Sequence, residues 1–219
     1  MKALICTCPK KGCAIHDAPV KARRYPWQVA EDVAEEISRV LRDGCERIEI
    51  AGSLRRRKSD VGDIEILYIP KIIEAKREGS LFGETDPMDC AALIIEALVE
   101  TGRLTLRLNV NTSHTYGPLN KLMLHVASGI PVDLFAATHE NWFNYLVCRT
   151  GPAELNTRIA SAAKRIGWKW HPYSFGFTAL DNGQEARMES EEDVFNFVGL
   201  PYADPEARGR DRNFEGSGQ

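Results

Sequence analysis

The chain has 219 residues, of which 43% are hydrophobic and 27% are charged, and its formal net charge is −3. This composition is typical of a soluble globular protein and excludes a uniformly basic nucleic-acid binder, although it allows a local basic surface. No apolar run approaches the roughly 20 residues of a membrane span, and the polar N-terminus has no signal-peptide core. We therefore expect a cytoplasmic protein with no membrane partner.

The first two thirds of the chain predict a sheet with flanking helices. Apolar residues recur every three or four positions between Pro26 and Gly44, which indicates an amphipathic helix. Short apolar segments with alternating side chains follow, separated by glycine turns, and these predict strands. The expected helices are 26–44 and 87–102, and the expected strands are 46–51, 64–69, 104–110, 119–126 and 130–135.

The last third changes character near Thr138, where we place a domain boundary. It combines helical periodicity with an aromatic-rich stretch that predicts short strands. The alternation of strands and helices along the whole chain indicates a mixed fold of the α+β class. The expected helices are 139–148, 152–167 and 189–198, and the short strands fall within 168–178.

Three acidic residues on apolar strands give the first functional signal. Asp63 and Glu65 are spaced by one residue, so both side chains point to the same face, and their repulsion is costly unless a cation lies between them. Asp133 lies in the otherwise apolar segment IPVDLF, where a buried charge is expensive. If the two strands are neighbours, the three carboxylates converge in the geometry of a phosphoryl-transfer site with two Mg²⁺ or Mn²⁺ ions.

The segment before these acids supplies groups that suit a phosphate ligand. Backbone N–H groups at Gly52 and Ser53, together with the Ser53 hydroxyl, can hold phosphate oxygens. Arg56 can pair with the outer phosphates. Cations on one side and donors on the other fit a nucleoside triphosphate. The alternative is a solvated strand face that carries Asp-x-Glu and binds nothing.

These residues stand in a longer pattern that resembles a known family. The stretch AGSLRRRKSDVGDIEIL (51–67) is similar to the signature of the polymerase-beta-like nucleotidyltransferases. PVDLF resembles the strand that carries their third carboxylate, and RTGPAELN resembles the turn and helix beside their nucleotide. ESEEDVFNFVGLPYADPEAR resembles the end of the thumb in family X DNA polymerases. The similarity covers about residues 25–208 and is closest to family X.

The resemblance implies a domain order. Residues 25–138 would form a nucleotidyltransferase palm, with a small mixed sheet and flanking helices, and residues 139–208 would form a thumb-like domain. A basic, cysteine-rich segment (1–24) would precede them, and a disordered tail (209–219) would follow. Because the palm begins almost at the start of the chain, we expect no room for an N-terminal lyase or DNA-gripping module. We therefore expect an enzyme that binds DNA weakly and acts distributively. A protein partner could supply the missing contacts to DNA.

The resemblance also implies roles for individual residues. Asp63 and Glu65 would bridge both metal ions, and Asp133 would be the third ligand and the acceptor of the proton from the primer 3′-hydroxyl. The contacts to the nucleotide would come from Gly52, Ser53, Arg56 and Gly62 at the triphosphate, Thr150 and Gly151 at the sugar, and Asn156 at the base.

Four residues depart from the polymerase pattern. Glu65 stands where family X enzymes usually have aspartate, although the wider superfamily accepts glutamate. Cys148 and Arg149 replace the aromatic residues that screen the sugar, which puts discrimination against ribonucleotides in doubt. Phe135 stands where the polymerases often place an arginine.

The resemblance implies a minimal family X DNA polymerase that adds dNMP from dNTP to a DNA 3′-hydroxyl and releases pyrophosphate. Its partners would be a nucleoside triphosphate and primer-template or gapped DNA, with a role in DNA repair or gap filling. The alternative is a template-independent nucleotidyltransferase that acts on RNA, a small molecule or a protein. A third reading is a degenerate binding protein without catalysis.

Two further features are separate from this site. Cys6, Cys8, Cys13 and His16 have a spacing that permits a structural zinc ion, and the alternative is a reduced tail with incidental cysteines. A basic group in the last third of the chain, interleaved with Trp168, could face DNA or could be a solvated helix end. Its members are Lys164, Arg165 and Lys169, and Lys121 could contact nucleic acid or triphosphate from a neighbouring strand.

Overall fold

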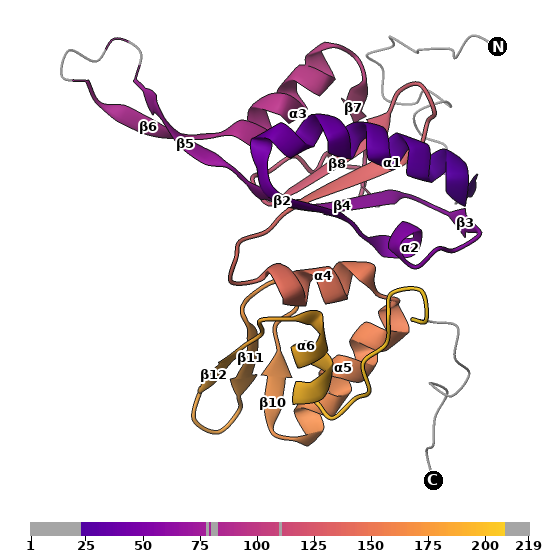
Figure 1. The fold of residues 1–219 in the computed structure, drawn as a ribbon, viewed down its shortest axis with the longest axis vertical. Coiled ribbons are helices and arrows are strands. Elements are labelled where there is room, and N and C mark those ends of the chain that lie inside the picture. The colour runs from indigo at the N-terminus through magenta and orange to yellow at the C-terminus, as the bar shows by residue number, and fades with distance from the viewer. Residues whose placement is uncertain (1–22, 78, 80–82, 110, 209–219) are drawn as a thin grey trace.

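The computed structural model describes residues 23–77, 79, 83–109 and 111–208 (Figure 1). The four expected zinc ligands between Cys6 and His16, and the expected tail 209–219, lie outside the described residues. In the described part of the chain, no helix is both long enough and apolar enough to cross a membrane.

A five-stranded sheet forms the centre of the first half, and its strand order is β2-β4-β9-β8-β7. Strands β4 and β9 are parallel, whereas the other neighbouring pairs are antiparallel. With the helices around it, this sheet gives the mixed α+β fold expected from the sequence. The strands are β2 (Cys45–Ile50), β4 (Ile64–Pro70), β7 (Leu104–Leu106), β8 (Asn120–His125) and β9 (Pro131–Ala136).

Helices cover both faces of this sheet (Figure 1). Helices α1 (Trp27–Leu41) and α3 (Cys90–Glu100) lie on one face, where the apolar stripe of α1 packs on Ile64, Ile66 and Tyr68 of β4. The alternate β4 residues Leu67 and Ile69 pack instead with Trp142 of α4 (Trp142–Thr150). Because side chains alternate along a strand, Glu65 points to the same face as Leu67, toward α4.

The last part of the chain has a core of its own on the far side of α4 (Figure 1). A three-stranded antiparallel sheet packs with two helices around Trp170, Phe177 and Phe195, which are all at least nine-tenths buried. The boundary that we expect near Thr138 stays a prediction. The elements are α5 (Ala153–Arg165), β10 (Trp168–Trp170), β11 (Gly176–Ala179), β12 (Glu185–Arg187) and α6 (Glu191–Phe197).

One expected helix start is wrong. Residues 85–89 form strand β6 (Thr85–Asp89), which pairs with β5 (Ile72–Lys76) in a hairpin that projects from the sheet (Figure 1). Pro87 therefore lies in this hairpin and does not begin α3. Asp89 caps the helix instead, because its carboxylate accepts a hydrogen bond from the Ala92 N–H at 2.9 Å.

The remaining elements are short. Strand β7 ends at Leu106, before the expected end at residue 110, which lies outside the described residues, and an isolated bridge pairs Leu108 with His114. The small elements are β1 (Tyr25–Pro26), η1 (Arg42–Gly44), α2 (Gly52–Arg55) and β3 (Asp60–Val61).

Candidate active site

The parallel pairing of β4 and β9 places two of the three predicted acids side by side. Glu65 lies directly opposite Asp133 in the register of the two strands. Asp63 lies between the bend at Gly62 and the start of β4. The neighbouring strands that the sequence analysis required are therefore present, and Glu65 and Asp133 share the face that looks toward α4.

Burial and neighbouring negative charges raise the pKa of two of these acids. Burial, with the neighbouring charge of Asp63, raises the pKa of Glu65 to about 7. Burial also raises the pKa of Asp133 to about 6, even though Arg107 opposes the shift. Carboxylates whose ionised forms are disfavoured in this way gain most from an added cation.

Each of the two paired acids already has an arginine neighbour. Arg107 follows β7 and its Nη2 donates to Oδ1 of Asp133 at 2.5 Å. Arg149 of α4 approaches Oε1 of Glu65 at 3.6 Å.

In the part of the chain that the structure describes, no three His, Cys, Asp or Glu side chains are gathered closely enough to hold a metal ion. The carboxylate oxygens are ligands that Mg²⁺ and Mn²⁺ prefer, so the donor chemistry fits these ions.

The Gly-Ser turn packs directly against Glu65. The Ala51 N–H donates to the Glu65 carbonyl at 2.8 Å, and Gly52 follows with φ of +64°. A Cβ at position 52 would collide with the Glu65 carboxylate. Glycine is therefore needed here both for its backbone conformation and for space. Ser53 lies half-buried in the next position, and Gly62 lies beside Arg24.

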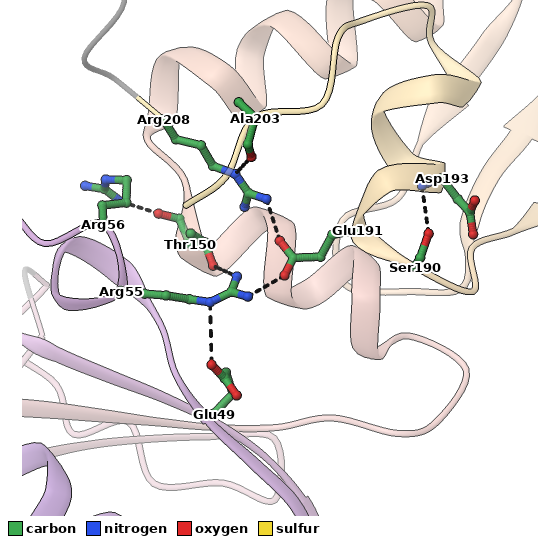
Figure 2. Close-up of polar contacts among 9 residues, drawn as sticks. All are labelled: Glu49, Arg55, Arg56, Thr150, Ser190, Glu191, Asp193, Ala203 and Arg208. Atoms are coloured by element: carbon green, nitrogen blue, oxygen red, sulfur yellow. Dashed lines mark hydrogen bonds and ion pairs between the residues drawn. The ribbon is translucent and has the colours of Figure 1, made fainter. Parts of the chain in front are cut away.

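Arginines of the α2 segment reach the last part of the chain (Figure 2). Arg55 Nη1 donates to the Thr150 hydroxyl at 2.8 Å, and Arg55 Nη2 pairs with Glu191 at 2.5 Å. Glu191 is also paired with Arg208 at 2.6 Å. Burial opposes ionisation of Glu191, but the hydrogen bond from Arg55 and the charge of Arg208 outweigh it and lower its pKa.

Several of the residues predicted to contact the nucleotide lie at this same junction. Arg56 Nη1 donates to the Thr150 carbonyl, and Gly151 lies next to the same guanidinium. Asn156 of α5 donates from Nδ2 to the Cys148 carbonyl at 2.8 Å, and its buried Oδ1 has no hydrogen-bond partner among the described residues. The structure thus brings Arg56, Thr150 and Gly151 together.

Some residues at the site were missed from the sequence. Arg107 carries no motif signal of its own. Glu191 and Arg208 stand within the segment that resembles the end of the thumb, but neither is named there as a site residue, and the Arg208 side chain is fully buried. The suggestion that Lys121 contacts substrate is wrong. It lies opposite Leu134, on the face covered by α1 and α3, whereas Glu65 and Asp133 look toward α4, and its Nζ donates to the Gly117 carbonyl at 3.0 Å.

The segment on the far side of this junction has a match among known protein families. Residues 145–209 match the family model of the DNA polymerase beta thumb. This match supports a polymerase-beta-like relationship and suggests a DNA-binding role for this part of the chain. The matched segment contains Arg149, Thr150, Glu191 and Arg208, and it begins after all three carboxylates. No curated protein sequence matches the chain.

Proposed function

We propose that this protein is a metal-dependent nucleotidyltransferase similar to a minimal family X DNA polymerase. It would transfer dNMP from dNTP to a DNA 3′-hydroxyl: a bond forms between the 3′-oxygen and the α-phosphorus, the bond from that phosphorus to the β-phosphate oxygen breaks, and pyrophosphate leaves. The observation that carries the proposal is the thumb match at residues 145–209, joined by Arg55 and Arg56 to the turn beside Glu65.

The roles proposed for individual side chains follow from their chemistry and position. Asp63, Glu65 and Asp133 would hold the divalent cations, since the charge of Asp63 is close enough to raise the pKa of both Glu65 and Asp133. Bound cations would neutralise charge on the triphosphate and lower the pKa of the attacking hydroxyl. Asp133 would accept the hydroxyl proton, because burial already raises its pKa toward that of a useful base.

The nucleotide would lie where α2 meets the end of α4. Gly52, Ser53, Arg56 and Gly62 would contact the triphosphate. Thr150 and Gly151, which lie beside the Arg56 guanidinium, would contact the sugar. Asn156 would reach the base with its buried Oδ1, which has no partner in the described part of the chain.

The DNA would be held by the thumb-like segment. Lys164, Arg165 and Lys169 are exposed around the end of α5 and β10. The aromatic residues beside them are used in the core instead: Trp170 is buried and its Nε1 donates to Asn144 at 3.0 Å. This basic group therefore suits phosphate contacts better than base stacking.

A second candidate is a template-independent nucleotidyltransferase that acts on RNA, a small molecule or a protein. The observation that favours it is the Arg149 position, where a guanidinium stacked on Phe135 stands in place of one of the aromatic residues expected beside the sugar. This enzyme would use the same carboxylates with another acceptor.

Primer extension with Mg²⁺ separates the two candidates. The substrates are a one-nucleotide gap, an open template-primer and a single strand, each with the four dNTPs and the four NTPs added singly. Incorporation of the complementary dNMP at the gap or template-primer would support the polymerase. Incorporation without regard to the template would support the second candidate. No incorporation by folded protein on any DNA substrate would contradict the polymerase proposal.

A further inference from the structure

Arg149 is held between the two halves of the protein by aromatic rings. Its guanidinium carbon lies 3.6 Å from the ring centroid of Phe135, on β9. The rings of Tyr145 and Tyr173 lie at 5.3 Å and 5.2 Å from the same carbon. The side chain therefore leaves α4 of the thumb-matching segment and ends on the carboxylate face of the sheet.

The guanidinium of Arg149 partly neutralises the negative charge of Glu65, but the two groups are not in close contact. The distance of 3.6 Å between Nη1 and Oε1 is longer than a hydrogen bond, and about one fifth of each side chain is exposed. The Nε–H of Arg149 has no hydrogen-bond partner among the described residues. The three rings thus fix where the charge lies, and the side chain of Tyr145 adds a hydrogen bond to Arg149.

The second arginine at the site is held differently. Arg107 donates to Asp133 at 2.5 Å, and it comes from the segment after β7, which belongs to the same sheet as its partner. Its contact does not depend on the position of α4. Of the two ion pairs, the one between Arg149 and Glu65 is the longer, and it links the sheet to the thumb-matching segment.

We propose that Arg149 is an internal counter-ion that occupies Glu65 in the cation-free protein and withdraws when a divalent cation binds there. The inference rests on the proposed function, because it takes Glu65 to be a cation ligand. A guanidinium at this distance repels a divalent ion and also blocks access to the carboxylate. Since such coupling is reciprocal, cation binding weakens the hold of α4 on the sheet, and loss of that hold favours cation binding.

Mn²⁺ binding without nucleotide tests this inference, because it can be measured by electron paramagnetic resonance independently of activity. Arg149→Gln removes the charge and is expected to bind Mn²⁺ at least about tenfold more tightly than wild type. Arg149→Lys keeps the charge and should stay within about threefold of wild type. Arg187→Gln is the matched control: it makes the same change in net charge, but Arg187 pairs with Glu140 away from the carboxylates.

The result that would overturn the inference is distinct from failure of the proposed function. If Glu65→Gln abolishes Mn²⁺ binding while Arg149→Gln leaves it unchanged or weaker, the cation site stands and the counter-ion is wrong. If no variant binds Mn²⁺ in a manner that depends on Glu65, both proposals fail.

A second variant covers the case in which Arg149→Gln does not fold, as judged by circular dichroism. Phe135→Leu removes the ring beneath the guanidinium and leaves every charge in place. It is expected to tighten Mn²⁺ binding by about threefold, because Arg149 is held less firmly. Unchanged binding in this folded variant would overturn the inference.

Discussion

Arg55 of α2 and Glu191 of α6 form an ion pair of 2.5 Å across 136 residues of sequence. The two side chains are 18% and 10% exposed, so the pair is largely shielded from solvent. Arg55 ends the short helix α2, which begins at Gly52 in the turn that packs on Glu65. The placement of the predicted triphosphate contacts therefore depends on the segment that matches the polymerase beta thumb.

Replacing Glu191 with glutamine should destabilise the protein in a pH-dependent way. The change leaves Arg208, which is fully buried, without its charged partner, and we expect a loss of about 3 kcal/mol in unfolding free energy at pH 7. The folded-state pKa of Glu191 is lowered, so its ionised form contributes stability above the unfolded-state pKa of about 4.3. That contribution is lost as the pH falls below this value.

Urea unfolding at pH 7 and at pH 3.5 measures this difference. Glu192→Gln is the control, because Glu192 is the next residue of α6 and is exposed. The difference in unfolding free energy between wild type and Glu191→Gln should be smaller at pH 3.5 than at pH 7. Glu192→Gln should have the unfolding free energy of wild type at both pH values. A difference in unfolding free energy of the same size at both pH values would show that the ion pairs of Glu191 with Arg55 and Arg208 do not stabilise the folded protein.

Gly52→Ala should both destabilise the protein and disturb the carboxylates. A non-glycine residue with positive φ costs about 1–2 kcal/mol, and the collision with Glu65 adds to this. Gly102→Ala is the matched control: Gly102 has φ of +70°, but no described atom lies within 4 Å of a Cβ there. Thermal unfolding should show the larger loss for Gly52→Ala, and equal losses would contradict the packing of this turn on Glu65.

The exposed basic group of the thumb-like segment should contribute to DNA affinity through phosphates. Replacing Lys164, Arg165 and Lys169 with glutamine is expected to reduce the slope of log K against log salt by about 0.9 per lost phosphate contact. Fluorescence anisotropy with a labelled duplex at several salt concentrations measures this slope. The same three-charge change at the exposed residues Arg39, Arg42 and Lys76 should leave it unchanged. Equal effects of both triple variants would mean that only net charge matters.

The sequence predicts the part of the site that depends on strands with regular alternation. Apolar runs around Glu65 and Asp133 mark both strands, and the register of β4 with β9 confirms that they are neighbours. The glycine before Ser53 also has a local signal, since positive φ favours that residue. The metal, nucleotide and proton-transfer roles stay predictions.

Other features depend on contacts that no local pattern records. Proline is tolerated both at a helix start and in an edge strand, so the pairing of Pro87 with Glu74 in the hairpin decides its place. Arg208 follows a polar, irregular stretch with no local sign of burial, but tertiary contacts with Glu191 and Phe195 bury it. Arg107 and Arg149 likewise reach the carboxylates from segments distant in sequence.

Incorporation of dNMP at a one-nucleotide gap by wild type, Asp63→Asn and Asp60→Asn tests the central claim most directly. Asp60 lies three residues before Asp63 and is an exposed partner of Arg24, so its variant makes the same charge change outside the predicted cation site. We predict that wild type and Asp60→Asn incorporate the complementary nucleotide, and that Asp63→Asn remains folded and loses at least about 10³-fold in rate. Equal activity of all three proteins would contradict the account.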